Sequence, residues 1–230
     1  MSTALDDLER AVAVRSRHAA LEADPLRYWR FAVSRIREAV RLFTAPEPID
    51  ELALRGPNKS GKTESKAAFV IRCCQKLPAL DGVRLPQWRG RVEAAQLCLD
   101  YKQQLLSVKP AYLRLLGRWP HRVRYVGEAL QSIHIKPAGC DTDNEAEWSV
   151  IHFLTQKNPD VGVGVRADIV DFDEPAVMSV LRELRKAGHA GRRSIILHGF
   201  TPTIRRQWHE VREDYGDTPR RSIRRIDLER

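Results

Sequence analysis

Apolar residues in the first 45 positions recur at helical spacing and predict two helices. The first spans residues 5–22 and has apolar side chains roughly on one face: Leu5, Leu8, Val12 and Val14. The second spans residues 25–43, with Asp24 in a capping position and Pro25 in the first turn. Its apolar stripe is longer and contains Leu26, Trp29, Val33, Ile36, Val40 and Phe43. We therefore expect residues 1–46 to form a helical segment packed on a core.

Further along, short runs with the alternation or β-branched content of strands are interleaved with longer helical patterns. The predicted strands are 51–54, 89–99, 122–126, 131–136, 149–156, 166–172 and 193–200. The predicted helices are 63–77, 101–117 with a break before Pro110, 176–188 and 203–216. The polar stretch 137–147 is predicted to be a loop. Alternation of strands and helices predicts an α/β fold with a mostly parallel sheet covered by helices on both faces.

Composition agrees with a folded, soluble protein. Of the 230 residues, 43% are hydrophobic and 30% charged, and no apolar run is long enough for a membrane span. The charged N-terminus does not resemble a secretory signal. Four cysteines without CxxC spacing favour reduced, buried thiols over a metal site. The formal net charge of +9 favours polyanionic partners such as nucleic acid, although a solvated basic surface is the alternative.

Residues 56–63, GPNKSGKT, match the phosphate-binding pattern G-x-x-x-x-G-K-T. Glycines let successive main-chain N–H groups curl around an anion, and the following helix presents its positive end to the same phosphates. Lys62 would reach the β- and γ-phosphates, and the Thr63 hydroxyl would bind Mg²⁺. A chance match in a surface turn is the alternative, but the predicted strand before the loop and helix after it favour the phosphate site. Its residues are Gly56, Pro57, Asn58, Lys59, Ser60, Gly61, Lys62 and Thr63.

A second candidate lies at the end of the apolar strand in ADIVDFDEP. Asp173 would face Mg²⁺, and Glu174 would polarise the attacking water. Asp171, two residues earlier and on the same face as Asp173, is a rival metal carboxylate. An acidic helix cap preceding Pro175 is the alternative, and it is compatible with catalysis. The strand 89–99 lies in the chain between the two motifs, and an inserted strand is typical of motor-type phosphate-loop ATPases.

The polar turn after the next strand is a third candidate. A hydroxyl at the tip of that strand would contact the γ-phosphate or its water and couple hydrolysis to movement, through Thr201, Pro202 and Thr203. A simple helix cap by Thr203 is the alternative.

The order of these motifs resembles that of the ATPase domain of the large terminase subunit, the DNA-packaging motor of tailed bacteriophages. The resemblance rests on GPNKSGKT (56–63), IVDFDEP (169–175) and HGFTPT (198–203). The β-rich residues 131–156 also resemble the hairpin insertion of that family, and the segment 24–31 resembles its N-terminal helical region. The similarity extends over about residues 24–215, but the first two motifs are shared with helicases.

The resemblance implies a RecA-like P-loop ATPase fold of the ASCE type, with the N-terminal helical segment 1–46 and the core 47–217. Residues 218–230 would begin a basic linker, with the family's nuclease domain absent. The cofactors would be ATP and Mg²⁺, with Thr63 and Asp173 at the metal. The catalytic residues would be Glu174, Lys62 and Asp173, and Thr201 would couple hydrolysis to movement.

The implied partners are double-stranded DNA, other copies of the chain in a ring on a capsid portal, and the small terminase subunit, with no membrane. The implied location is the cytoplasm of the bacterial host, at the procapsid portal. A helicase-like or other DNA-dependent ATPase fragment is the alternative function, and a nucleotide-binding switch is a third.

One position departs from the family pattern. Many terminases have an arginine four residues before the motif lysine, where this chain has Asn58, although the adjacent Lys59 would supply a positive charge. An arginine from a neighbouring subunit would act in its place, with Arg192, Arg193, Arg205 and Arg206 as unranked candidates.

Several other residues have two interpretations. Trp29 and Arg30 would lie near an adenine base, but core packing is the preferred interpretation for Trp29. Four arginines have two interpretations as well: Arg89, Arg91, Arg122 and Arg124. They would contact DNA phosphates or form a solvated surface, and the solvated surface is the preferred interpretation.

Overall fold

The computed structural model describes residues 2–57, 59–157, 166–174, 176–186, 193–200 and 223–228. In this part of the chain an eight-stranded sheet has the order β10-β1-β9-β8-β4-β7-β6-β5. Its strands are β1 (Glu51–Arg55), β4 (Glu93–Cys98), β5 (His121–Val126), β6 (Ala129–Ile135), β7 (Ser149–Thr155), β8 (Ile169–Phe172), β9 (Ile195–Phe200) and β10 (Ile223–Asp227). A two-stranded sheet is made of β2 (Ala79–Leu80) and β3 (Val83–Arg84).

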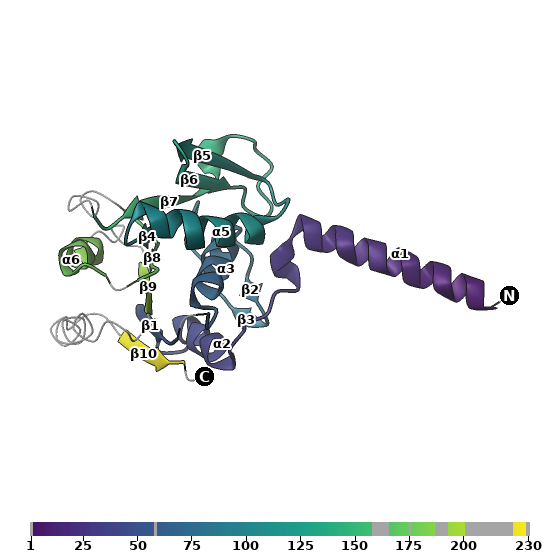
Figure 1. The fold of residues 1–230 in the computed structure, drawn as a ribbon, viewed down its shortest axis with the longest axis horizontal. Coiled ribbons are helices and arrows are strands. Elements are labelled where there is room, and N and C mark those ends of the chain that lie inside the picture. Colours follow the sequence, from purple (N-terminus) through teal and green to yellow (C-terminus); the bar gives the residue numbers. More distant parts are fainter. Residues whose placement is uncertain are drawn as a thin grey trace.

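The sheet is parallel except at one edge. Strands β10, β1, β9, β8, β4 and β7 pair in parallel, whereas β6 pairs with β7 and β5 with β6 in antiparallel fashion. The antiparallel β5–β6 hairpin extends the sheet beyond β7 at the top of Figure 1. The predicted α/β class and the mostly parallel sheet are therefore confirmed. A hairpin insertion is present too, but it begins with β5 at residue 121, earlier than the predicted 131–156.

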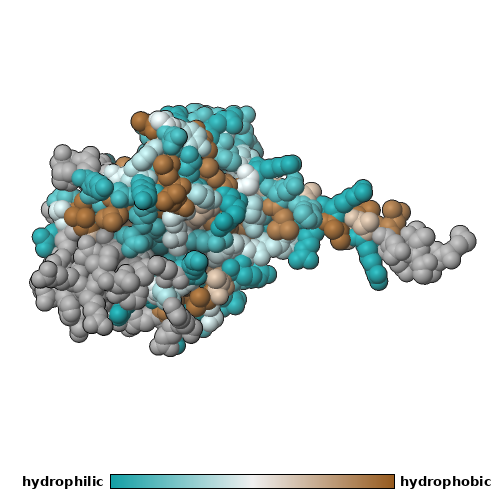
Figure 2. Space-filling model, viewed as in Figure 1, coloured by the Kyte–Doolittle hydropathy of each residue, from teal (hydrophilic) through white to brown (hydrophobic). Residues whose placement is uncertain are grey.

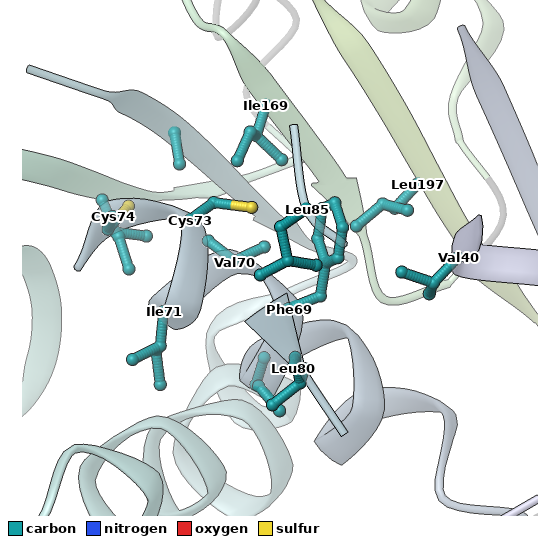
Figure 3. Close-up of a cluster of buried hydrophobic side chains, with 14 of the residues drawn as sticks. Val40, Phe69, Val70, Ile71, Cys73, Cys74, Leu80, Leu85, Ile169 and Leu197 are labelled. Atoms are coloured by element: carbon teal, nitrogen blue, oxygen red, sulfur yellow. The ribbon is translucent and has the colours of Figure 1, made fainter. Parts of the chain in front are cut away.

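Helices cover both faces of the sheet. Adjacent strand residues point to opposite faces, so neighbouring residues of one strand pack against different helices. In β9, Ile195 and Leu197 belong to the cluster that contains α3 (Lys62–Cys74), while Ile196 belongs to the cluster that contains α6 (Met178–Lys186). Figure 3 shows Phe69, Val70 and Cys73 of α3 among the buried side chains on the first face. The α3 face also has contributions from α2 (Ser34–Arg41) and α5 (Lys109–Leu116).

The strand inserted between the two motif strands, β1 and β8, is not the predicted strand 89–99. Strand β4, at residues 93–98, lies on the far side of β8, and β9 lies between β1 and β8. The chain reaches β9 only after β8, so the strand between the two motif strands comes later in the sequence than both motifs. Which strand separates them depends on parallel pairing across the sheet, and local pattern does not encode that pairing.

The predicted single helix over residues 25–43 is wrong. A 3₁₀ turn at Pro25–Arg27 is followed by a non-helical stretch, then α2 and a second 3₁₀ turn at Leu42–Thr44. The Asp24 carboxylate caps the first turn, and a carboxylate oxygen of Asp81 accepts a hydrogen bond from the main-chain N–H of Phe31. These contacts bend the chain, yet Leu26, Ile36, Val40 and Phe43 of the predicted stripe are all buried.

Helix α1 (Ser2–Ala23) projects away from the sheet, as Figure 1 shows. Residues 8–19 are exposed, so in this part of the segment 1–46 the structure differs from the expected packing on the core. Exposed fractions of 62% for Leu8, 56% for Val12 and 60% for Val14 place its apolar residues in solvent, and Figure 2 shows hydrophobic patches along this arm. No helix in the described residues is long and apolar enough to cross a membrane.

The predicted helix 101–117 is not broken before Pro110. It runs as α4 (Tyr101–Gln103), a π-helical segment (Gln104–Val108) and α5. Pro110 lies in the first turn of α5, where its lack of an N–H is tolerated. The π-helical segment therefore takes the place of a break.

The prediction that residues 218–230 begin a linker is wrong for the described residues 223–228. Strand β10 pairs with β1 along its whole length, from Glu51 opposite Ile223 to Arg55 opposite Asp227. Leu228, which follows β10, is only 3% exposed. The arginines in this stretch gave it the composition of a linker, but Ile226 and Leu228, two positions apart and so on one face, pack on the core.

Candidate functional site

The glycine loop connects β1 to the start of α3, as the sequence predicts. Gly61, the N-cap of α3, has φ of 78°, a left-handed conformation that glycine adopts without strain. Lys59 also has a positive φ, of 63°. A Cβ on Gly56 would lie 2.7 Å from the Cβ of Leu228, so this position has no room for a side chain. Asn58 lies outside the described residues.

The Lys62 ammonium lies over the loop itself. It donates hydrogen bonds to the carbonyl oxygen of Gly56 at 2.7 Å, to that of Pro57 at 2.8 Å and to Ser60 Oγ at 3.1 Å. Burial lowers the pKa of Lys62, although the nearby Glu174 opposes this shift. The loop therefore gathers polar groups around the lysine that the motif identifies.

Asp173 lies at the carboxyl end of β8, directly against the loop. Thr63 Oγ1 donates a 2.7 Å hydrogen bond to Asp173 Oδ1, and Gln103 Nε2 donates one of 3.2 Å to Asp173 Oδ2. The hydroxyl and the carboxylate expected to share a metal ion are thus in direct contact, although they are 110 positions apart in the chain.

Glu174 is half-buried beside Asp173. Burial, and then the neighbouring Asp173 carboxylate, raises the pKa of Glu174 above its ordinary value. A raised pKa makes a carboxylate a stronger base, as activation of water requires.

One cavity of about 570 Å³ brings the two motifs together. From the loop side it is lined by Lys59, Ser60, Gly61, Lys62, Thr63 and Glu64. From the other elements it is lined by Gln103, Leu106, Ser107, Pro110, Ala111, Arg114, Asp173 and Glu174.

Asp171, the rival metal carboxylate, has different surroundings. It is 2% exposed and accepts a 2.6 Å hydrogen bond from the ammonium of Lys66. Burial raises the pKa of Asp171 to about 6, against the opposing effect of Lys66. Asp173 contacts Thr63 and lines the cavity, whereas Asp171 is paired behind it.

The donor set fits a magnesium ion. Thr63 and Asp173 present a hydroxyl and a carboxylate oxygen, the hard ligands that Mg²⁺ prefers, and Mg²⁺ keeps several waters and binds substrate phosphates as well. Among the described residues no group of three or more His, Cys, Asp or Glu side chains could hold a metal ion. A magnesium ion held through one or two protein ligands and a nucleotide does not need such a group.

Several predicted residues cannot be placed at this site. Thr201, Pro202 and Thr203, with Arg192, Arg205, Arg206 and Pro175, lie outside the described residues. Arg193 is described, but it lies at the amino end of β9, opposite the site. Its guanidinium bonds to Asp50 Oδ1 and to the carbonyl oxygens of Phe43 and Ile49.

Three of the arginines predicted to face DNA form ion pairs with glutamates of this chain. Arg122 and Arg124 of β5 both lie within ion-pair distance of Glu145, at 3.8 and 3.0 Å. Arg91 pairs with Glu93 at 2.6 Å. Trp29 is partly buried against the hydrophobic core, consistent with its packing interpretation.

Sequence reasoning missed several residues at or beside the site, among them the polar residues Lys66, Gln103 and Arg114. Lys66 follows Lys62 by one helical turn inside an apolar helix, and a lysine on a buried face was a detectable signal. Gln103 and Arg114 reach the cavity from the helical run that follows β4, and no local pattern indicates that approach.

The sheet has β9 between β1 and β8, and the glycine loop joins β1 to α3. Together these features define an α/β fold of the RecA-like P-loop type. The large terminase from the thermophilic bacteriophage D6E, in complex with ADP, overlaps the chain with a TM-score of 0.59 at 12% identity, covering 84% of this chain and 44% of that one. Another crystal form of the D6E terminase gives a TM-score of 0.53 at 13% identity, covering 86% and 46%. At these identities the overlaps show a shared fold, and this chain spans less than half the length of those terminase chains.

The ATPase domain of the large terminase of Thermus phage P74-26 overlaps more loosely, with a TM-score of 0.43 at 13% identity over 79% of this chain and 88% of that one. No protein-family model matches the sequence, and no curated protein matches it.

Proposed function

We propose that the chain hydrolyses ATP with Mg²⁺ as the motor domain of a DNA-packaging terminase. One observation carries the enzymatic part of the proposal: Lys62 and Thr63 line the same cavity as Asp173 and Glu174. A phosphate-binding loop and two carboxylates on one cavity are the groups that phosphoryl transfer to water requires.

Each residue has a separate role in this reaction. The Lys62 ammonium and the N–H groups of the loop bind the phosphate oxygens, which stabilises the charge of the transferred phosphoryl group. Thr63 and Asp173 would hold the magnesium ion, which neutralises phosphate charge when it is bound. Glu174 orients the attacking water and takes its proton on a carboxylate oxygen.

The motor part of the proposal rests on the fold. The D6E protein that shares this fold is a large terminase, and one of its structures contains ADP. We infer that this chain translocates double-stranded DNA into a procapsid, with the segment Thr201–Thr203 coupling hydrolysis to movement. The formal net charge of +9 supports binding to a polyanion.

We further propose that the protein acts in an assembly. Copies of the chain would form a ring on the capsid portal, with the small terminase subunit, in the cytoplasm of the bacterial host. An arginine from the neighbouring copy would complete the site, and isolated chains would then hydrolyse ATP slowly.

Phosphate release in the presence of DNA tests the enzymatic proposal. Glu174→Gln should lower kcat by about 10²–10⁴-fold, because the water loses its base, while ATP still binds. Lys62→Ala should abolish ATP binding in calorimetry. Glu128→Gln, an exposed glutamate in the β5–β6 turn, is the matched control and should behave as wild type.

Full activity of Glu174→Gln would contradict the assigned base. If the wild-type chain takes up no ATP with magnesium present, the proposed function is wrong. Duplex unwinding by this chain alone would favour the helicase alternative over the packaging motor.

A further inference from the structure

Lys66 is a buried cation that the proposed reaction does not use. It lies on α3 one turn after Lys62 and is 2% exposed. Its ammonium donates hydrogen bonds to Asp171 Oδ1 at 2.6 Å and to the carbonyl oxygen of Phe172 at 2.7 Å, and it lies 3.5 Å from Asp173 Oδ1. A single ammonium therefore contacts three consecutive residues at the end of β8.

The neighbouring strand leaves room for this lysine. A Cβ on Gly199 of β9 would lie 2.8 Å from Lys66 Cε and 3.0 Å from Nζ, so any other residue at position 199 would displace the ammonium. Lys66 thus occupies a fitted site between α3, β8 and β9, unlike a lysine whose end reaches solvent.

The contacts of Lys66 differ between two carboxylates of the same residue type. Asp171 and Asp173 lie on the same face of the sheet, two residues apart. The shorter bond of Lys66 goes to Asp171, and the Asp173 carboxylate receives its hydrogen bonds from Thr63 and Gln103 at the cavity. Of the two, Asp173 lines the cavity.

We propose that Lys66 is a positioning residue that occupies Asp171 and thereby leaves Asp173 as the carboxylate for the metal ion. The proposal rests on the proposed function, because it concerns the magnesium that accompanies the nucleotide. Lys66 acts through the two aspartates and touches no reacting atom.

Two substitutions should change magnesium binding in opposite directions. In Asp171→Asn, Lys66 loses its closest anionic partner and turns to Asp173, where it competes with the metal ion. In Lys66→Met, the competing positive charge is gone, so the negative charge of both carboxylates acts on the ion that Asp173 contacts. The double variant Lys66→Met/Asp171→Asn removes both effects and should return magnesium binding to the wild-type range.

The experiment titrates Mg²⁺ into the full chain with a non-hydrolysable ATP analogue and follows heat release, with thermal melting alongside. Asp171→Asn should raise the half-saturating Mg²⁺ concentration roughly tenfold, the order expected from one charge-assisted hydrogen bond. Lys66→Met should lower that concentration. Both single variants should melt earlier than wild type, because each breaks the buried ion pair between Lys66 and Asp171.

The matched control is Arg185→Met. It breaks another buried ion pair, with Glu51 at 2.8 Å, at the amino end of β1 and away from the cavity. It should melt earlier than wild type without changing the Mg²⁺ titration, which separates loss of stability from loss of positioning.

An unchanged half-saturating concentration in Asp171→Asn, or shifts of the same sign in both single variants, would overturn the proposal. If Asp171→Asn does not fold, the lowered concentration in Lys66→Met and its return in the double variant decide the question. Failure of wild type to bind the analogue with Mg²⁺ would instead contradict the proposed function itself.

Discussion

At the scale of single residues, two lysines on α3 have different surroundings. Lys62 and Lys66 are four positions apart on α3, so they lie on the same side of the helix. Lys62 bonds to the carbonyl oxygens of the loop and lines the cavity, whereas Lys66 is enclosed and bonds to the end of β8. Under the proposed function, these two lysines serve the phosphate and the carboxylates separately.

A second buried charge pair lies at the amino end of the sheet. Both guanidinium nitrogens of Arg185 that contact Glu51 do so at 2.8 Å, and Glu51 is 0% exposed. Burial would raise the pKa of Glu51, but His198, with Nε2 3.8 Å from Glu51 Oε2, and the hydrogen-bonded Arg185 outweigh it and hold this pKa at about 2.

Arg185→Met should lower the free energy of unfolding by about 3–5 kcal/mol at neutral pH, because it removes the guanidinium that pairs with a buried carboxylate through two hydrogen bonds. Since the folded-state pKa of Glu51 is below its ordinary value of 4.5, the contribution of this group is present above that value and is lost as pH falls toward about 2. Urea unfolding across this range measures both effects. Glu51→Gln/Arg185→Met is the control, and it should lose this acid-dependent component. A full acid response in that double variant would contradict the assignment.

At the scale of elements, β10 is linked to the glycine loop. Leu228 follows β10, donates its N–H to the carbonyl oxygen of Arg55 and packs where a side chain on Gly56 would lie. The strand at the sheet edge therefore supports the first residue of the phosphate loop.

Leu228→Ala should lower the free energy of unfolding by about 2–5 kcal/mol, the range for a buried leucine, and weaken ATP binding as well. Denaturant unfolding and calorimetry measure the two effects. Leu8→Ala, at a leucine that is 62% exposed, is the control and should change neither. Unaltered nucleotide affinity in a destabilised Leu228→Ala would show that β10 supports the fold but not the loop.

The elements also show how far the sequence predicts this structure. The loop at 56–63 and the strand before Asp173 follow from local patterns of glycine, charge and alternation, and the structure brings them to one cavity. The position of β9 between β1 and β8, and the strand at 223–227, depend on pairing between distant segments. The helix predicted at 25–43 is interrupted because residues 31 and 37 contact Asp81, which lies far along the chain. Local periodicity contains no information about that contact.

At the scale of the whole molecule, the core and the projecting α1 meet at a small junction. Arg118 N–H donates to the carbonyl oxygen of Glu22 at 2.8 Å, and the side chains of the same two residues pair at 3.0 Å. These contacts involve the last turn of α1, so the preceding residues add little to the stability of the core.

Removal of residues 1–19 should therefore leave the melting temperature of the core nearly unchanged, since exposed positions contribute within about 0.5 kcal/mol each. Thermal melting followed by circular dichroism checks this outcome. A variant with Gly117→Ala is the contrasting case, because a Cβ there would lie 2.6 Å from Pro25 and should destabilise the junction. A large drop in the truncated chain would mean that α1 supports the core.

The pairing of β1 has a consequence for the order in which the protein matures. Both neighbours of β1 in the sheet, β9 and β10, come from residues beyond 194, whereas the loop that β1 supports begins at residue 56. During translation the ribosome must therefore release residues 195–200 before β1 gains its first partner, and residues 223–227 before it gains the second. A nascent chain would hold its glycine loop in an unfinished setting until β9 and β10 emerge, so under the proposed function nucleotide capture would wait for these two strands.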